Sequence, residues 1–391
     1  MTAPYRQYDP SLLEPTYPKR TRRLEDLAVE LAAQAGQLTK GLHPTVVASL
    51  RELVRSMNCY YSNLIEGHRT TPRDIERALN QDLSSDPKQR DLQLEAKAHI
   101  EVQRLIDLDA DWQGQNVVSP VFMQRIHKAF YDRLPDSLWQ IDTATVVPGQ
   151  FRTVSVQIGS HVPPNPKTVP KFLERFSQVY EPEKLSKIDQ IIAVSAAHHR
   201  LLWIHPFLDG NGRVVRLLSH AYLQQIGIGS SLWSVSRGLA RKVQTYRKLL
   251  AVADGQRQDN YDGRGNLTMA GLVRFSDFFL ETCLDQMAFM EKLLEPQRLL
   301  KRMEVYAVVE TNQRQLLPGS FLILKAVFLE GEMSRGNAAA VTGYQERQAR
   351  SVLAQLLNRG LLTSNSAKGA VRLAFPVTFA EQLFPQLWTD L

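Results

Sequence analysis

Apolar side chains recur every three or four positions through most of the chain, which is the pattern of amphipathic helices. Two N-terminal stripes show it, Leu24, Leu27, Leu31 and Leu38, then Val46, Leu50, Leu53 and Val54. A helix is expected after Ser119, a suitable N-cap with Pro120 at the first helical position. Further helices are expected over about 86–111, 167–180, 187–203, 235–253 and 268–294. The pattern predicts a mainly α fold.

One segment, residues 139–164, breaks this periodicity, because β-branched residues alternate with polar ones around Pro148 and Gly149. We expect a short β-hairpin there. Residues 1 to about 20 are rich in Pro, Tyr and Arg and are expected to form an extended arm.

The last ninety residues have a different layout. Helices are expected over 321–329, 337–341 and 345–358, followed by two short strands around a polar tip, SNSAKG. This order is typical of a winged helix-turn-helix. We therefore divide the chain into an N-terminal helical region (1–115), a helical core (116–300) and a winged-helix domain (301–391).

The composition fits a globular protein, since 43% of the 391 residues are apolar and 22% are charged. The net charge of +7 is spread along the chain, which permits an anionic partner without requiring one. Two isolated cysteines exclude a disulfide framework and indicate a reducing compartment. Because no signal peptide or membrane span is recognisable, we expect a soluble cytoplasmic protein without a membrane partner.

Residues 205–216, HPFLDGNGRVVR, contain the features of a phosphate site. Gly210 and Gly212 let the backbone turn sharply and approach an anion, and a helix starting near Asn211 would point its positive end the same way. Arg213 and Arg216 are three positions apart on one helix face, so two guanidinium groups can reach one polyphosphate.

Two further residues of this segment suit catalysis. Asp209 is a carboxylate placed to hold Mg²⁺ against phosphate oxygens, and His205 can accept a proton from an attacking hydroxyl. Taken singly, a histidine before proline is usually structural, an Asn-Gly or Asp-Gly pair is usually a turn, and helical arginines are usually solvated. Together, within twelve positions, they form a specific constellation.

This segment matches HPFx[D/E]GNGRxxR at every defined position, and the chain therefore resembles the Fic family of protein adenylyltransferases. The resemblance implies an α-helical core that binds ATP and Mg²⁺ and transfers AMP to a Ser, Thr or Tyr hydroxyl of a protein. It assigns the general base to His205, Mg²⁺ binding to Asp209, the phosphate cradle to Gly210, Asn211 and Gly212, the inner phosphates to Arg213 and the terminal phosphate to Arg216.

Two weaker similarities extend the resemblance. Residues 149–164 resemble the family's flap, which docks the target segment, so Arg152, Val154, Val156 and Ile158 are expected to meet the target. Tyr246 resembles one of two paired tyrosines near the adenine of relatives, although Thr245 stands where the other would be.

Residues 62–67, SNLIEG, fit the family's inhibitory motif [S/T]xxxE[G/N]. The resemblance implies that Ser62 and Glu66 lie beside the site and that Glu66 pairs with Arg216, leaving ATP in an unproductive pose. The alternative is a surface glutamate at the end of a helix, with Gly67 as the residue after its C-cap.

Three functions remain open at this point. The leading one is AMP transfer to a protein, including this chain itself, inhibited by Glu66 within one chain or across a homodimer. The second is removal of AMP, with Glu66 positioning a water. The third is a nucleotide-sensing DNA-binding regulator, whose C-terminal module would meet phosphates weakly through Arg347, Arg350, Lys368 and Arg372. The alternative is that this module forms a protein contact or a dimer surface.

Overall fold

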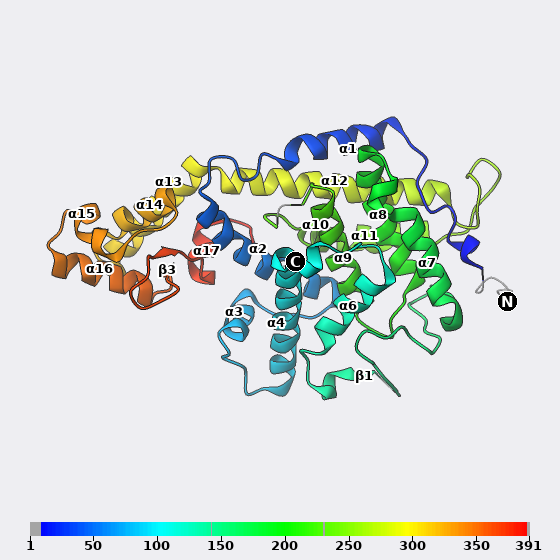
Figure 1. Cartoon of the computed structure of the whole chain (residues 1–391), viewed down its shortest axis with the longest axis horizontal. Helices are drawn as coiled ribbons and strands as arrows, with labels where there is room; N and C mark the ends of the chain where they lie inside the picture. Colours follow the sequence, from blue (N-terminus) through cyan, green and yellow to red (C-terminus); the bar gives the residue numbers. More distant parts are fainter. Residues whose placement is uncertain (1–8, 142, 230, 389–391) are drawn as a thin grey trace. The chain divides into compact units, whose positions relative to one another are not determined.

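The computed structural model describes residues 9–141, 143–229 and 231–388, so part of the predicted N-terminal arm, residues 1–8, lies outside the described residues. The chain is mainly helical (Figure 1). It divides into two compact units, unit 1 with residues 1–35 and 58–287, and unit 2 with residues 36–57 and 288–391. The sequence-based division into three domains stays a prediction.

Unit 1 is built around one buried helix. Helix α8 (Lys187–Ile204) packs against α7 (Val169–Tyr180), α9 (Asn211–Gln225) and α1 (Arg22–Ala35). Nearly every side chain of α8 is buried, as expected of a helix that is covered on all sides. The other helices of the unit are the end of α2 (Pro44–Glu66), α3 (Pro72–Leu79), α4 (Pro87–Leu108), α5 (Ala110–Gln113), α6 (Pro120–Tyr131), α10 (Val235–Arg241), α11 (Val243–Ala253) and most of α12 (Met269–Leu294).

Local signals set where these helices begin. The Ser119 hydroxyl accepts the N–H of Phe122 at 3.1 Å, which confirms it as the N-cap of α6. Ser186 caps α8 in the same way through the N–H of Asp189. Gly210 precedes α9 with a left-handed φ of 75°, so the predicted glycine turn into a helix is confirmed.

The predicted hairpin over 139–164 is displaced and much shorter. The paired strands are β1 (Gln140–Ile141) and β2 (Ala144–Thr145), with Ile141 opposite Ala144. Between residues 149 and 164 the described backbone forms one bridge, between Ile158 and His161. A hydrogen-bonded turn does occur at Pro148 and Gly149, where the Gln150 N–H donates to the Val147 carbonyl at 3.0 Å, but it is not the turn that joins β1 and β2.

Strand pairing in residues 149–164 is limited because part of this segment lacks backbone N–H donors. Pro163 and Pro164 have no N–H to give to a ladder. In addition, the carbonyl oxygens of Val154 and Pro164 accept hydrogen bonds from the side chain of Arg152. The segment is therefore held by a side chain rather than by strand pairing.

The described part of the arm is packed rather than extended. It begins with a short 3₁₀ helix, Pro10–Leu13. The Pro15 carbonyl then accepts from the buried Arg200, and the Tyr17 hydroxyl donates to Asp189 at 2.9 Å. Both partners lie on α8, so this stretch is part of the core of unit 1.

Unit 2 contains the first part of α2 and a series of short elements. These are α13 (Pro296–Asn312), α14 (Ser320–Glu330), α15 (Ala338–Thr342), α16 (Glu346–Asn358), β3 (Leu362–Thr363), β4 (Arg372–Leu373) and α17 (Val377–Leu383). Strands β3 and β4 pair antiparallel, with Leu362 opposite Leu373. The predicted helices α14, α15 and α16 agree with the structure to within a residue or so.

The basic residues of unit 2 are partly engaged within the unit. Arg350 pairs with Glu346 at 2.9 Å, and Arg372 donates to Asn365 at 2.6 Å. Binding of DNA through these residues, and the winged-helix assignment itself, stay predictions. None of the described helices is both long and apolar enough to cross a lipid bilayer. Cys59 and Cys283 are free and buried.

Candidate active site

The site begins at the end of α8, where Pro206 stops the helix, because a residue before proline is disfavoured in the α conformation. His205 takes a left-handed conformation instead, with φ 50° and ψ 64°, and its N–H donates to the Leu201 carbonyl at 3.0 Å. For a residue other than glycine this conformation costs about 1–2 kcal/mol. The turn is therefore held by surrounding contacts.

Asn211 closes the loop that follows. Its side-chain oxygen accepts the N–H of Phe207 and its amide donates to the Phe207 carbonyl, both at 2.9 Å. Asn211 is 3% exposed, so both polar ends are satisfied inside the protein. Its side chain therefore shapes the loop from Phe207 to α9, and its place in a phosphate cradle stays a prediction.

His205 is unprotonated at neutral pH. Burial, together with the charges of Arg152 and His161, lowers the pKa of its imidazole to about 4, against smaller opposing effects of a backbone hydrogen bond with Leu202 and the charge of Asp209. A neutral imidazole can accept a proton. The side chain thus meets the protonation requirement of a general base.

Asp209 is oriented by a residue that sequence reasoning missed. The Tyr131 hydroxyl on α6 donates to Oδ2 of Asp209 at 2.7 Å, and the Tyr131 ring lies against Gly210, where a Cβ would be 3.2 Å from it. Burial, together with the Asp209 charge, raises the pKa of Tyr131, which therefore stays a donor. No sequence motif joins these two residues, which are seventy-eight positions apart.

Asp209 fits a magnesium site of one particular kind. Among the described residues no group of three or more His, Cys, Asp or Glu side chains can hold a metal ion unaided. Mg²⁺ is often bound by one or two carboxylates, with nucleotide phosphates and waters as the remaining ligands. The single carboxylate fits that arrangement.

The start of α9 forms an anion cradle, and a carboxylate lies in it. A Cβ added to Gly212 would be 2.1 Å from Oε1 of Glu66, so only glycine allows this approach. Helix N-termini attract anions through their free N–H groups and dipole. Glu66, the last residue of α2, thus stands where a phosphate would be favoured.

Arg216 is held by two of the three defined residues of the 62–67 motif. Its Nη2 donates to Glu66 at 2.5 Å and its Nε donates to the Ser62 hydroxyl at 2.9 Å. Burial alone would raise the pKa of Glu66, but the charge and hydrogen bond of Arg216, with the charges of Arg213 and His68, outweigh it and hold this pKa below its ordinary value. Glu66 is therefore ionised at neutral pH.

Arg213 is held by a second carboxylate that sequence reasoning missed. Its Nη2 donates to Oε2 of Glu95 on α4 at 2.5 Å, and Nδ1 of His68 lies 2.7 Å from the same oxygen. The guanidinium also lies 5.0 Å above the ring of Phe130. Nε of Arg213 is buried and has no hydrogen-bond partner within the described chain.

Tyr246 lies within the core, 3% exposed. Its hydroxyl is 2.7 Å from Nε2 of His198, and burial raises its pKa. The charges of Arg216 and Glu66 act on it, which places it near the site. Its predicted contact with adenine stays a prediction.

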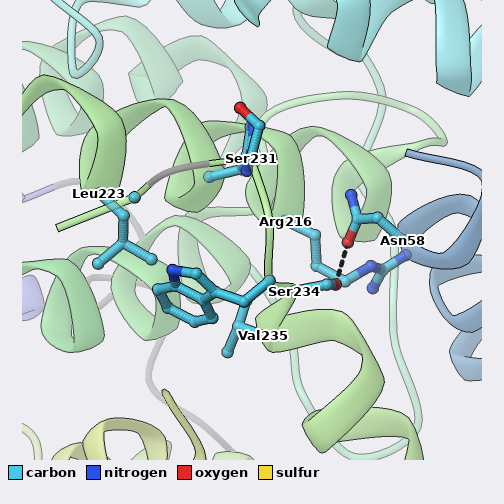
Figure 2. A pocket seen from close by; sticks show the side chains of 9 residues that line it. Asn58, Arg216, Leu223, Ser231, Ser234 and Val235 are labelled. Atoms are coloured by element: carbon cyan, nitrogen blue, oxygen red, sulfur yellow. Dashed lines mark hydrogen bonds between the residues drawn. The ribbon is translucent and has the colours of Figure 1, made fainter. Parts of the chain in front are cut away.

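Arg216 also lines a small pocket with Asn58, Ser231 and Ser234 (Figure 2). Figure 2 shows Asn58 and Ser234 beside it, joined by a hydrogen bond of 2.5 Å. The pocket lining beside Arg216 is thus mixed, since it also includes the apolar side chains of Leu223, Trp233 and Val235.

The four predicted flap residues divide into two kinds. Val154 and Ile158 are 45% and 42% exposed and Val156 is half-buried, so these side chains are available to a target. Arg152 is 4% exposed, and its Nε donates to the His205 carbonyl at 2.7 Å. Docking of a target on this segment stays a prediction, with Arg152 facing inward.

The geometry defines a class of site: a helix N-terminus with two arginines for a polyphosphate, a carboxylate for a divalent cation and a neutral histidine for a hydroxyl proton. Comparisons with known proteins identify a family segment in this region of the chain. Residues 118–223 match the family model described as the Fic/DOC family. The "Protein adenylyltransferase Fic" of Drosophila erecta is 38% identical over 79 residues, which are 20% of this chain and 16% of that protein. The chain thus spans about a sixth of the length of the curated relatives it matches.

Solved structures show the same fold. A Fic family protein from Desulfovibrio desulfuricans G20 has a TM-score of 0.54 at 17% identity, with 91% of this chain and 97% of that chain covered. Fic-1 from C. elegans has a TM-score of 0.55 at 16% identity, with 70% and 73% covered. This chain therefore contains a segment that matches the Fic/DOC family, residues 118–223, and shares the fold of these Fic proteins.

Proposed function

We propose that this chain is a protein adenylyltransferase that transfers AMP from ATP to a hydroxyl of a protein and is inhibited by its own Glu66. The observation that carries the proposal is the position of Glu66, paired with Arg216 and placed against Gly212 at the start of α9. A site that contains a phosphate-like carboxylate is suited to a phosphate ligand. Similarity to adenylyltransferases supports the choice of reaction.

In this reaction the target hydroxyl oxygen attacks the α-phosphorus of ATP, and His205 takes the hydroxyl proton. The bond between the α-phosphorus and its bridging oxygen breaks, so AMP stays on the target and pyrophosphate leaves. Arg213 and Arg216 stabilise the charge on the departing phosphates. Mg²⁺ held by Asp209 would neutralise further phosphate charge when bound.

Inhibition follows from competition for Arg216. A terminal phosphate must replace the Glu66 carboxylate on the guanidinium before the nucleotide can align for in-line attack. Ser62 holds the same arginine from the preceding turn of α2, so it fixes the position in which Glu66 can pair. Removing Glu66 should therefore release the reaction.

The test is transfer of label from ATP carrying a radioactive α-phosphate, in Mg²⁺, with and without cell lysate. Wild type, Glu66→Gln, Glu66→Gly and Glu66→Gly/His205→Ala are compared. Glu52→Gln is the matched control, since Glu52 lies on the same helix and pairs with another arginine, Arg55, at 2.6 Å.

We expect label on protein with Glu66→Gly, less with Glu66→Gln, and none when His205 is also replaced. Glu52→Gln should behave as wild type. Label without lysate would identify the chain as its own target. Absence of transfer in every lane, with ATP bound, would refute the proposal in favour of nucleotide sensing. Release of AMP from a modified protein by the wild type would instead indicate hydrolytic removal of AMP, with Glu66 positioning the water.

A further inference from the structure

The end of α8 is capped by the segment that follows β2, through one side chain above all. The last carbonyls of a helix have no partners within it and need donors from elsewhere. Arg152 supplies them to the residues around the predicted base: Nε to the His205 carbonyl at 2.7 Å, and Nη2 to the Ile204 carbonyl at 3.5 Å. Its main-chain N–H donates to the Pro206 carbonyl at 2.9 Å.

The same guanidinium binds the segment at two points. Nη1 donates to the Val154 carbonyl at 3.2 Å, and Nη2 donates to the Pro164 carbonyl at 2.6 Å. His161 adds a link, with Nε2 2.8 Å from the Trp203 carbonyl on α8. Residues 152–164, here called the flap segment, are thus fastened to the turn at His205.

The charge of Arg152 is unusual in its surroundings. Within the described chain its side chain donates only to main-chain carbonyl oxygens, and the residue is 4% exposed. Burial lowers its pKa to about 10, so it remains a cation at neutral pH. The negative end of the α8 dipole favours a cation there, which offsets the missing carboxylate.

We propose that Arg152 is a positioning residue for His205: its guanidinium holds the left-handed turn of the base, fastens the flap segment to it, and places a positive charge beside the imidazole. The planar fork matters, because four carbonyl oxygens are reached from three nitrogens in fixed directions. This inference rests on the proposed function only where it concerns reaction rate.

Two consequences separate positioning from general support of the fold. A lysine keeps the charge but loses the fork, so the turn at His205 relaxes while the imidazole still faces a cation. A methionine loses both. The charged and titratable groups that act on His205 are Arg152, His161 and Asp209, and only the first is changed in these variants.

The experiment uses the full chain carrying Glu66→Gly, with Arg152→Lys and Arg152→Met added separately. Arg200→Lys and Arg200→Met are matched controls. Arg200 is also fully buried, also donates to carbonyl oxygens, those of Pro15 and Ala253, and has its pKa lowered to about 10 in the same way. Thermal unfolding, kcat, KM for ATP and the imidazole titration of His205 by NMR are measured for each.

We expect both Arg152 variants to lose about 10- to 100-fold in kcat, with KM for ATP changed less than about 2-fold, because the base is misplaced while the cradle is intact. Arg152→Met should raise the pKa of His205 by about one unit, and Arg152→Lys should leave it unchanged. The Arg200 variants should lose stability but keep kcat and the His205 titration of the parent.

The inference is overturned if the Arg152 variants lose no more kcat than the Arg200 variants, or if Arg152→Met leaves the His205 pKa at the parent value. Should Arg152→Met fail to fold, the kcat and KM of Arg152→Lys decide. If the Glu66→Gly parent transfers no AMP, the proposed function fails. In that case the NMR titration, which needs no activity, still tests the inference.

Discussion

Neutralising Glu95 should lower the free energy of unfolding of the protein and, at the same time, increase the rise in Tm that ATP causes. Glu95 pairs with Arg213 at 2.5 Å, and the two side chains are only 13% and 7% exposed. Glu95→Gln keeps the size and one acceptor oxygen but leaves the guanidinium without its counter-charge. ATP phosphates would then supply the missing charge.

The size of the effect follows from burial. Breaking a buried ion pair costs about 3–5 kcal/mol, and because glutamine keeps a hydrogen bond we expect about 2–3 kcal/mol. A domain of 150–250 residues loses about 2–4 °C in Tm for each kcal/mol. Unit 1 is slightly larger, so a loss of about 4–8 °C is expected.

Differential scanning fluorimetry with and without ATP and Mg²⁺ measures both effects. Glu101→Gln is the control, since Glu101 lies on the same helix and pairs with Arg133 at 2.9 Å, but both side chains are about one-third exposed. That pair should contribute less than about 1 kcal/mol. Equal Tm losses in the two variants, or an ATP-induced rise in Tm no larger for Glu95→Gln than for wild type, would refute the reasoning.

Three further predictions concern neighbouring residues. Burial lowers the pKa of His127 to about 4, so its contribution to stability is complete above pH 6.5 and is lost as pH falls toward 4, by about 1.4 kcal/mol per pH unit. Denaturant unfolding at pH 7.5 and pH 5 should therefore show a smaller loss of unfolding free energy between the two pH values for His127→Gln than for wild type. Equal losses in the two proteins would contradict this. Tyr131→Phe, which removes the donor to Asp209, should raise the Mg²⁺ concentration for half-maximal transfer about 10-fold, and an unchanged value in a metal titration would count against that role. Asn211→Ala removes both bonds to Phe207 and should cost about 2–3 kcal/mol in the free energy of unfolding, whereas a cost below 1 kcal/mol would mean that the loop closes without it.

The sequence was most informative where the chemistry is local. Residues 205–216 follow one another along a turn and a helix, so residue type and spacing alone indicated the cradle between Gly210 and Arg216. The helix bounds there were equally predictable, because Pro206 ends one helix and Gly210 begins the next.

Long-range partners could not be found in this way. Glu95 is 118 positions from Arg213, and it stands in a helix where glutamates usually face solvent. Tyr131 looks like one more apolar residue of α6 until the fold brings it to Asp209. No spacing rule connects such pairs, because only the packing of α4 and α6 against α9 brings them together.

The flap segment shows a different limit. Alternation of β-branched and polar residues predicted strands. In the structure, however, the side chain of Arg152 donates to backbone carbonyl oxygens that strand pairing would use. A buried arginine within an alternating stretch signals that side-chain donors can replace strand pairing. Its burial, however, is visible only in the fold.

The two motif arginines never face an empty site, because Arg216 already holds Glu66 and Arg213 already holds Glu95. If the site binds a polyphosphate as proposed, the ligand must displace these carboxylates from the arginines, so that its entry exchanges one ion pair for another. A small anion that binds one arginine interacts with it little better than the carboxylate that it displaces. At longer range its attraction to the site is weak, because each arginine is already neutralised by its carboxylate. A polyphosphate that reaches both arginines and the start of α9 together recovers both interactions and adds a third. The carboxylates already paired with Arg213 and Arg216 would thus make the site favour anions that bind both arginines over the abundant monovalent anions.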